Sequence, residues 1–285
     1  MWIFYAFLSS FLAGVTAILA KCGIKNTDSN VATALRTIVV LVFSWIMVFV
    51  VGSQDEIQSI DAKTWIFLIL SGLATGASWL CYFRALSIGD INKVVPVDKS
   101  SVIFTMILAF LVLGEEISIV KFIAMILLGA GTYMMIERKD SAVKDVGKVW
   151  FVYALLSAIF ASLTTILGKI GIAGVESNLG TALRTGVVLI MAWLVVGVSG
   201  KMHTVRQIKK RELGFIVLSG IATGGSWLCY YKALKDGLAS VVVPIDKLSV
   251  VVTIAFSYIV FHEKLSKKAA IGLAAVILAT FMMIL

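Results

Sequence analysis

Long apolar runs separated by short polar segments fill this chain from end to end. A helix that spans a membrane needs about 20 mostly apolar residues, and ten stretches of this kind can be recognised. They lie near residues 2–20, 31–51, 64–83, 94–113, 119–136, 149–168, 179–199, 213–231, 241–261 and 269–285. The connections hold most of the charge, and no strand-like alternation is visible. The pattern predicts an all-α integral membrane protein with ten transmembrane helices.

The second half of the chain repeats the first at a shift of 148 residues without a gap. We call residues related by this shift repeat mates. Ala-Leu-Arg-Thr at 34–37 and Ser-Trp-Leu-Cys-Tyr at 78–82 return unchanged at 182–185 and 226–230. Each half holds five spans, so the second half must cross the membrane in the opposite sense. The sequence therefore predicts two inverted five-helix repeats, 1–137 and 149–285, joined by a connecting loop at 138–148.

The composition argues against most other classes of protein. Of the 285 residues, 60% are hydrophobic and 14% are charged, whereas soluble domains are about 45–50% apolar and about 25% charged. The net charge of +9 would suggest nucleic acid in a soluble protein. Here the basic residues flank apolar runs, so the expected anion is the lipid headgroup and no nucleic-acid partner is expected. No HExxH, Walker, GxSxG or metal-ligand motif is present, and we expect no enzyme activity, metal or cofactor.

The basic residues are distributed unevenly between the loops. Eight of the 25 Lys and Arg lie at or inside span ends, and 14 of the remaining 17 lie on the side of the odd-numbered loops. Lys and Arg prefer cytoplasmic loops. The split of 14 to 3 predicts a protein of the prokaryotic plasma membrane with both termini outside the cytoplasm.

The eight basic residues at or inside span ends form four pairs of repeat mates. A charge at the centre of a span costs around 2.5–3.5 kcal/mol on insertion scales, so these residues should line a water-filled space or pair with acids. By inversion they predict two basic vestibules, one at each face, separated by a septum. A pathway lined in this way favours anionic or zwitterionic cargo through its potential. The eight residues are Lys21, Arg36, Arg84, Lys99, Lys169, Arg184, Lys232 and Lys247.

Candidate pathway residues come from two repeated clusters, the charged positions and the polar and aromatic ends of the third and eighth spans. They are Arg36, Arg184, Asp98, Lys99, Asp246, Lys247, Ser78, Trp79, Tyr82, Ser226, Trp227 and Tyr230. The aromatic residues have an alternative role as an interfacial belt. Gly72 and Gly76, with their mates Gly220 and Gly224, have the small-xxx-small spacing of close helix packing.

Four further residues are candidates for coupling or gating. They are Glu115, Glu263, Pro96 and Pro244. For the two glutamates, local capping or pairing is the alternative. For the two prolines we favour a helix start, where the missing N–H costs nothing, over a gating kink.

The chain resembles the drug/metabolite transporter superfamily, in its EamA-like branch. The local marks are Pro96 followed by Leu-Gly-Glu at 113–115, and Pro244 followed by Phe-His-Glu at 261–263, where His262 replaces the usual glycine. Each half is also similar to the single-repeat, five-span bacterial and archaeal transporters. The resemblance implies a central cavity lined by the first, third and fourth helices of each repeat. It also implies cytoplasmic termini, the opposite of the charge split, and for this chain we follow the charges.

Together these features predict a secondary transporter for a small anionic or zwitterionic metabolite, such as an amino acid or organic acid. Its two repeats would provide alternating access to a site near the midplane. A flippase for an anionic lipid-linked headgroup and a non-transporting membrane scaffold are the alternatives. The expected partners are the bilayer and a small-molecule substrate, with a coupling ion left open, and the expected state is a monomer or weak dimer.

Overall fold

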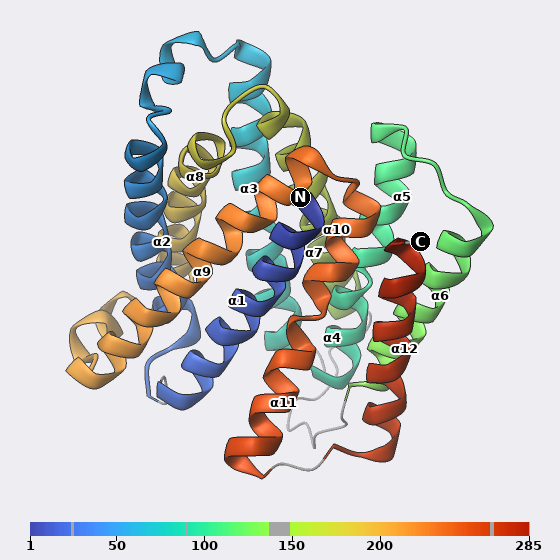
Figure 1. Ribbon diagram of the computed structural model, residues 1–285. Coiled ribbons are helices and arrows are strands. Elements are labelled where there is room, and N and C mark those ends of the chain that lie inside the picture. Colours follow the sequence, from blue (N-terminus) through green and yellow to red (C-terminus); the bar gives the residue numbers. More distant parts are fainter. Residues whose placement is uncertain (24–25, 89–90, 137–148, 263–264, 285) are drawn as a thin grey trace.

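The computed structural model describes residues 1–23, 26–88, 91–136, 149–262 and 265–284, and every regular element in these ranges is a helix. The first repeat contains α1 (Trp2–Gly23), α2 (Ser29–Val51), the 3-10 helix η1 (Gln54–Ser59), α3 (Ala62–Ile88), α4 (Ile91–Lys99), α5 (Ser101–Leu113) and α6 (Ile119–Met134). The second contains α7 (Val149–Ala173), α8 (Ser177–Val198), η2 (Met202–Gln207), α9 (Lys210–Asp236), α10 (Ala239–Lys247), α11 (Ser249–Phe261) and α12 (Lys267–Ile284). The order of elements is the same in both repeats, and α1 and α7 start at opposite ends of the bundle (Figure 1).

Local signals that recur in both repeats set the start of the second helix in each. Asp28 precedes α2 and accepts a hydrogen bond from the backbone N–H of Asn30. Its repeat mate Glu176 precedes α8 and accepts from the N–H groups of Asn178 and Leu179. A carboxylate in this position satisfies backbone donors that a helix leaves unpaired and also complements the helix dipole.

The predicted fourth and ninth spans are each built from two helices. α4 and α5 meet at Ser100, and α10 and α11 meet at its repeat mate Leu248. Pro96 and Pro244 lie inside α4 and α10 rather than in their first turns, so the prediction that they start a helix is wrong. A proline inside a helix removes one backbone hydrogen bond, and in both repeats the helix ends within four residues of it.

The two repeats interlock along four helix pairs. α1 packs along α9, α3 along α7, α2 along α8 and α6 along α12, so each pair joins one repeat to the other. Glycines allow the close approach of α3 to α8 and of α9 to α2. A Cβ atom on Gly72 would lie 2.7 Å from the Cβ of Val187, and one on its mate Gly220 would lie 2.6 Å from the Cβ of Val39. The predicted role of these glycines in close helix packing is confirmed.

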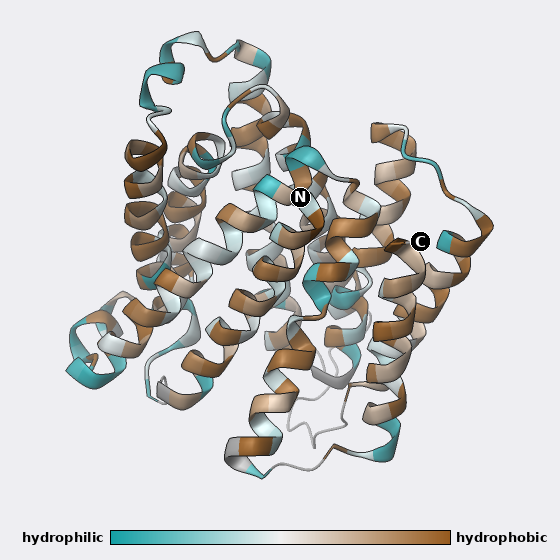
Figure 2. Ribbon diagram, in the orientation of Figure 1, coloured by the Kyte–Doolittle hydropathy of each residue, from teal (hydrophilic) through white to brown (hydrophobic). Residues whose placement is uncertain are grey.

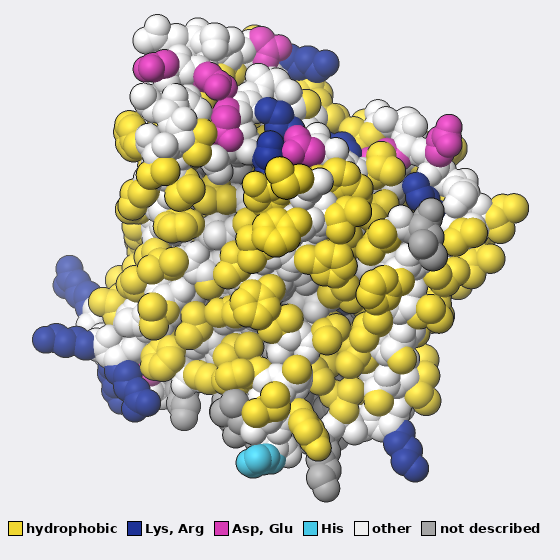
Figure 3. Space-filling view, viewed as in Figure 1, with side chains coloured by type: hydrophobic (Ala, Val, Ile, Leu, Met, Phe, Trp, Pro, Cys, Tyr) yellow, Lys and Arg dark blue, Asp and Glu magenta, His cyan; other side chains and the backbone are white. Residues whose placement is uncertain are grey.

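The outer surface of the bundle is that of a membrane protein. Large apolar side chains such as Phe49, Leu111 and Ile190 are more than 60% exposed. The helices are mostly apolar in the middle and polar at the turns (Figure 2). In Figure 3, hydrophobic side chains cover the middle of the visible face, and charged side chains gather at its upper and lower edges.

Nine segments of the described chain are long and apolar enough to cross a membrane, with α4–α5 and α10–α11 each counting as one segment. The remaining helix, α6, is apolar but has only 16 residues. It packs along α12 and completes the two sets of five. The structure confirms an all-helical membrane protein built from two repeats.

Candidate functional site

A cavity of about 250 Å³ lies between α1, α2, α3 and α9. Arg36 and Trp79 line it from the first repeat, and Ser226 and Trp227 line it from the second. The other lining residues are small or hydroxylated: Ala13, Thr16, Thr33, Thr37 and Thr223. The cavity thus combines one cation with two indole rings and several hydroxyl groups.

A second compartment of about 210 Å³ adjoins the first, because Ala13, Ser226 and Trp227 line both. α7 contributes Thr164 and Thr165 to this compartment, α9 contributes Tyr230 and Tyr231, and α10 contributes Asp246. Six of the predicted pathway residues therefore meet around these two spaces. They are Arg36, Trp79, Ser226, Trp227, Tyr230 and Asp246.

Two aspartates bind serines of the opposite repeat in the same way. Asp246 accepts a hydrogen bond from Ser9 of α1, with an O–O distance of 3.0 Å, and Ser226 donates to the Ser9 carbonyl at 3.0 Å. In the mate arrangement, Asp98 accepts from Ser157 of α7 at 2.7 Å, and Ser78 donates to the Ser157 carbonyl at 3.0 Å. Both sets of hydrogen bonds connect the two repeats, and Ser226 and Asp246 of the first set also line the compartments.

The two predicted arginines lie in different surroundings. Arg36 is half-buried, lines the cavity and donates to the hydroxyl of Thr33 on its own helix at 3.2 Å. Within the described part of the chain, no carboxylate lies within ion-pair distance of Arg36. Arg184 is 2% exposed and donates to Ser71 at 2.8 Å and to Thr75 at 2.6 Å. The two arginines are repeat mates in the same sequence motif, but Arg36 is accessible from the cavity and Arg184 is enclosed by protein.

The remaining predicted residues lie away from the two compartments. Lys99 is exposed and lines a space of about 100 Å³ together with Pro96 and Tyr133. Lys247 is half-buried at the end of α10, and Pro244 is fully enclosed within that helix. Tyr82 packs against a small apolar cluster that includes Ala85.

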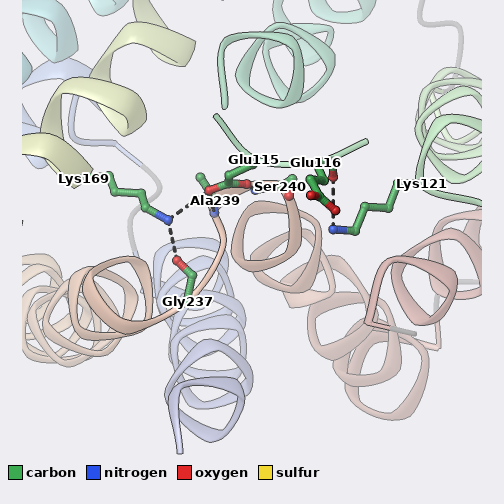
Figure 4. Close-up of polar contacts among 7 residues, drawn as sticks. All are labelled: Glu115, Glu116, Lys121, Lys169, Gly237, Ala239 and Ser240. Carbon is green, nitrogen blue, oxygen red and sulfur yellow. Dashed lines mark hydrogen bonds and ion pairs between the residues drawn. The ribbon is translucent and has the colours of Figure 1, made fainter. Parts of the chain in front are cut away.

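Glu115 links three helices at the face opposite the start of α2. Its carboxylate accepts from the backbone N–H groups of Ala239 and Ser240, at 2.7 and 2.9 Å, at the start of α10. Lys169 of α7 donates to the same carboxylate at 3.0 Å and also to the Gly237 carbonyl (Figure 4). Burial raises the pKa of Glu115, but the hydrogen bonds from Ser240 and Lys169 outweigh it, so the pKa lies below its usual value. Its mate, the candidate Glu263, lies outside the described residues.

The structure has one accessible basic end rather than the two vestibules that the sequence predicts. On the side of the first-repeat cations, Lys21, Arg84 and Lys99 are exposed and Arg36 lines the cavity. On the other side, Arg184 is enclosed and Lys169 is engaged by Glu115. The difference arises because the protein adopts an asymmetric arrangement of two repeats that have the same order of elements.

Sequence reasoning missed the hydroxyl side chains that surround the arginines. Thr16 and Thr223 line the cavity with their oxygens 3.2 Å apart, and their mates Thr164 and Thr75 are 3.3 Å apart. The signal that could have found them was present, because Ser and Thr four residues apart recur at 71 and 75 and at 219 and 223. Within the described ranges, no three His, Cys, Asp or Glu side chains gather as a metal site would require.

Comparison with known proteins places this architecture in a family. The model of the EamA-like transporter family matches residues 1–137 and again residues 148–285. The chain belongs to the EamA-like transporter family. This membership agrees with the resemblance to the drug/metabolite transporter superfamily. It identifies the chain as a transporter of that type.

Two curated relatives are named as transporters without a stated substrate. An uncharacterized transporter in the cobO 3' region of Sinorhizobium sp. is 41% identical over 134 residues, which are 47% of this chain and 95% of the relative. That relative is therefore about as long as one EamA-like repeat. An uncharacterized transporter of Methanothermobacter thermautotrophicus is 25% identical over 232 residues, which are 77% of this chain and 64% of the relative.

A solved crystal structure shares the fold. It covers 98% of this chain and 96% of its own, with a TM-score of 0.77 and 16% sequence identity. A likeness at this level of identity concerns the fold alone.

Proposed function

We propose that this protein is a secondary transporter that moves a small anionic or zwitterionic metabolite, of the amino-acid or organic-acid class, by alternating access. The observation that carries the proposal is Arg36, a cation that lines a cavity inside the membrane and has only a threonine hydroxyl as its described partner. A guanidinium has five N–H donors in a planar fork that matches a carboxylate. Cargo with such a group would satisfy the donors that the protein leaves open.

The walls and the size of the cavity support a small cargo. Ligand sites combine mostly apolar walls with a few polar groups that fix orientation, and the rings of Trp79 and Trp227 provide such walls beside the hydroxyl of Ser226. Each of the two adjoining compartments, about 250 and 210 Å³, is smaller than the roughly 300–1,000 Å³ that ligand sites occupy, and only together do they reach the lower part of that range. Their size favours a metabolite over a lipid-linked headgroup with its chain.

The asymmetry of the two repeats supports alternating access. The cavity reaches Thr33, about one turn from the start of α2, whereas the corresponding end of α8 is filled around Arg184. Exchanging the conformations of two inverted repeats would open the second end and close the first.

Counterflow in proteoliposomes tests the proposal. Vesicles containing the purified protein are loaded in turn with unlabelled amino acids and organic acids, and the uptake of the same labelled solute is measured. Saturable, stereospecific counterflow of one anionic or zwitterionic class is expected. Lipid scrambling without solute counterflow would favour a flippase, and the absence of both would favour a scaffold.

A further inference from the structure

Arg184 joins α8 to two other helices at the closed end of the bundle. Its Nε and terminal amine donate to Ser71 and Thr75 of α3, at 2.8 and 2.6 Å. Its guanidinium carbon also lies 4.8 Å from the ring centre of Tyr231 and 5.5 Å from that of Trp227, both on α9. Hydrogen bonds to a charged group and cation–π contacts are both strengthened where water is excluded. Arg184 thus holds α3, α8 and α9 together.

The repeat supplies Arg36 with an equivalent set of partners. The mates of Ser71 and Thr75 are Ser219 and Thr223 of α9, and the mates of Trp227 and Tyr231 are Trp79 and Phe83 of α3. Each partner of Arg184 is therefore matched by a residue of the same chemical kind, on the helix that inversion requires.

The Ser219 and Thr223 hydroxyls can still accept hydrogen bonds. Ser219 Oγ donates to the Ile216 carbonyl, and Thr223 Oγ1 donates to the Ser219 carbonyl. A hydroxyl that donates once still has lone pairs with which to accept. Ser71 shows the same combination on the other side, because it donates to the Thr164 carbonyl while it accepts from Arg184.

The backbone packing of α3 against α8 beside Arg184 is the same as that of α9 against α2 beside Arg36. The difference between the surroundings of the two arginines therefore comes from other helix contacts. A Cβ on Gly72 would lie 3.2 Å from the Arg184 carbonyl, and a Cβ on Gly220 would lie 3.2 Å from the Arg36 carbonyl. By contrast, α8 packs against α9, whereas α2 and α3 show no comparable packing among the described residues. The asymmetric step is therefore the approach of α9 to α8 at one end and the separation of α3 from α2 at the other.

We propose, building on the alternating access proposed above, that Arg184 and Arg36 are alternate locks. In the state seen here, Arg184 binds Ser71 and Thr75 and stacks between Trp227 and Tyr231, which closes one end, while Arg36 faces the cavity and receives cargo. In the opposite state, Arg36 binds Ser219 and Thr223 between Trp79 and Phe83, and Arg184 turns to the cavity. Each arginine thus alternates between cargo and a Ser–Thr pair of the helix beside it.

The matched double variants S71A/T75A and S219A/T223A test this exchange. Both are made in a background where Cys22, Cys81 and Cys229 are replaced, and each carries one reporter cysteine. The reporters are the repeat mates Thr33→Cys, at the cavity, and Thr181→Cys, which is fully buried in α8. Purified protein in nanodiscs exposes both faces to a water-soluble maleimide, and the rate of labelling is measured without added solute.

The two double variants should shift the equilibrium in opposite directions. Because each lost hydrogen bond to a charged group is worth about tenfold or more in an equilibrium constant, S71A/T75A should raise labelling at position 181 by at least roughly tenfold. S219A/T223A should leave position 181 protected and raise labelling at position 33. Thr75→Ser keeps the acceptor oxygen and should protect position 181 as the parent does. If the double variant does not purify, the single variant Thr75→Ala, which removes the 2.6 Å bond, replaces it.

Unchanged protection of position 181 in S71A/T75A, or the same shift in both double variants, would overturn the lock. Solute counterflow with the same proteins separates this outcome from a failure of the proposed function. Opposite labelling shifts without counterflow of any anionic or zwitterionic solute would support the alternating arginine locks and refute the proposed class of cargo. Counterflow of such a solute without labelling shifts would support the proposed class of cargo and refute the alternating arginine locks.

Discussion

At the scale of single residues, the environment of an arginine decides whether its guanidinium is available to bind cargo. Arg36 and Arg184 occur in the same four-residue sequence at the same place in their repeats. One guanidinium is bonded to two hydroxyls and enclosed by aromatic rings, and the other faces a cavity. The proposed affinity for an anion therefore belongs to Arg36 in this state.

Replacing the charge of Arg36 should weaken cargo binding. Arg36→Gln keeps a polar, hydrogen-bonding side chain, shorter than that of arginine, but loses the positive charge. The apparent affinity in counterflow, measured from the side onto which Arg36 opens, should fall about tenfold to a hundredfold, the worth of one hydrogen bond to a charged group. Arg84→Gln is the control, because Arg84 is exposed and lines neither compartment. Equal affinity in the two variants would refute a cargo role for Arg36.

At the scale of elements, two kinds of contact position the helices. Carboxylates at helix starts join elements that are distant in sequence, as Glu115 of the α5–α6 turn does at the start of α10. Glycines allow helices of opposite repeats to approach closely. Both kinds of contact lie outside the cavity and affect it only through the helices that they hold.

Loss of the Glu115 charge should destabilise the closed end. Its side chain is 4% exposed and that of Lys169 is 17% exposed, so Glu115→Gln leaves a largely buried cation without its counter-charge. We expect a loss of about 1–3 kcal/mol in the free energy of unfolding, measured by thermal or denaturant unfolding in detergent. Glu116→Gln changes the neighbouring, more exposed glutamate and should have little effect.

The same pair predicts a dependence on pH. Because the folded-state pKa of Glu115 lies below its usual value of 4.5, its stabilising effect is present at neutral pH. That effect should be lost as the pH falls below about 4.5 and through the lower folded-state pKa. The stability difference between the parent and Glu115→Gln should therefore shrink below that pH. A difference that stayed constant down to pH 3 would contradict the assignment.

Close packing between α3 and α8 should not tolerate an added methyl group. Gly72→Ala would place a Cβ 2.7 Å from the Cβ of Val187, and overpacking of this kind costs about 1–3 kcal/mol. Gly186→Ala in α8 is the control, because no atom lies within 4 Å of its added Cβ. Unfolding should occur at a lower temperature for the first variant and at the same or a higher temperature for the second.

At the scale of the whole molecule, charge is distributed unequally between the two ends. In Figure 3, most of the visible Asp and Glu lie at the upper edge of the bundle, whereas Lys and Arg lie at both edges. η1 carries Asp55 and Glu56, whereas η2, its mate at the other end, carries Arg206. We propose that the basic end faces the cytoplasm, following the preference of Lys and Arg for cytoplasmic loops.

Thiol labelling in intact cells tests this orientation. Single cysteines at the exposed positions Gln58 and Lys209, in a background without native cysteines, should respond differently to an impermeant maleimide. The cysteine at 58 should react, and the one at 209 should react only after the cells are permeabilised. The opposite pattern would place the termini in the cytoplasm and would make the cavity of this structure open outward.

The amino-acid pattern alone predicts the class of protein, the two repeats and the position of each charge within its span. Apolar length sets which segments cross a membrane, and an exact shift of 148 residues relates the halves whatever their conformation. The folded chain was needed to show which of the two identical Ala-Leu-Arg-Thr motifs faces the cavity. It also showed that the predicted fourth and ninth spans each break in two, and that Asp98 and Asp246 bind serines of the opposite repeat. The physical reason is that inverted repeats have the same local preferences at both ends. Contacts between residues more than 100 positions apart, such as Arg184 with Ser71, favour one of two nearly equivalent arrangements.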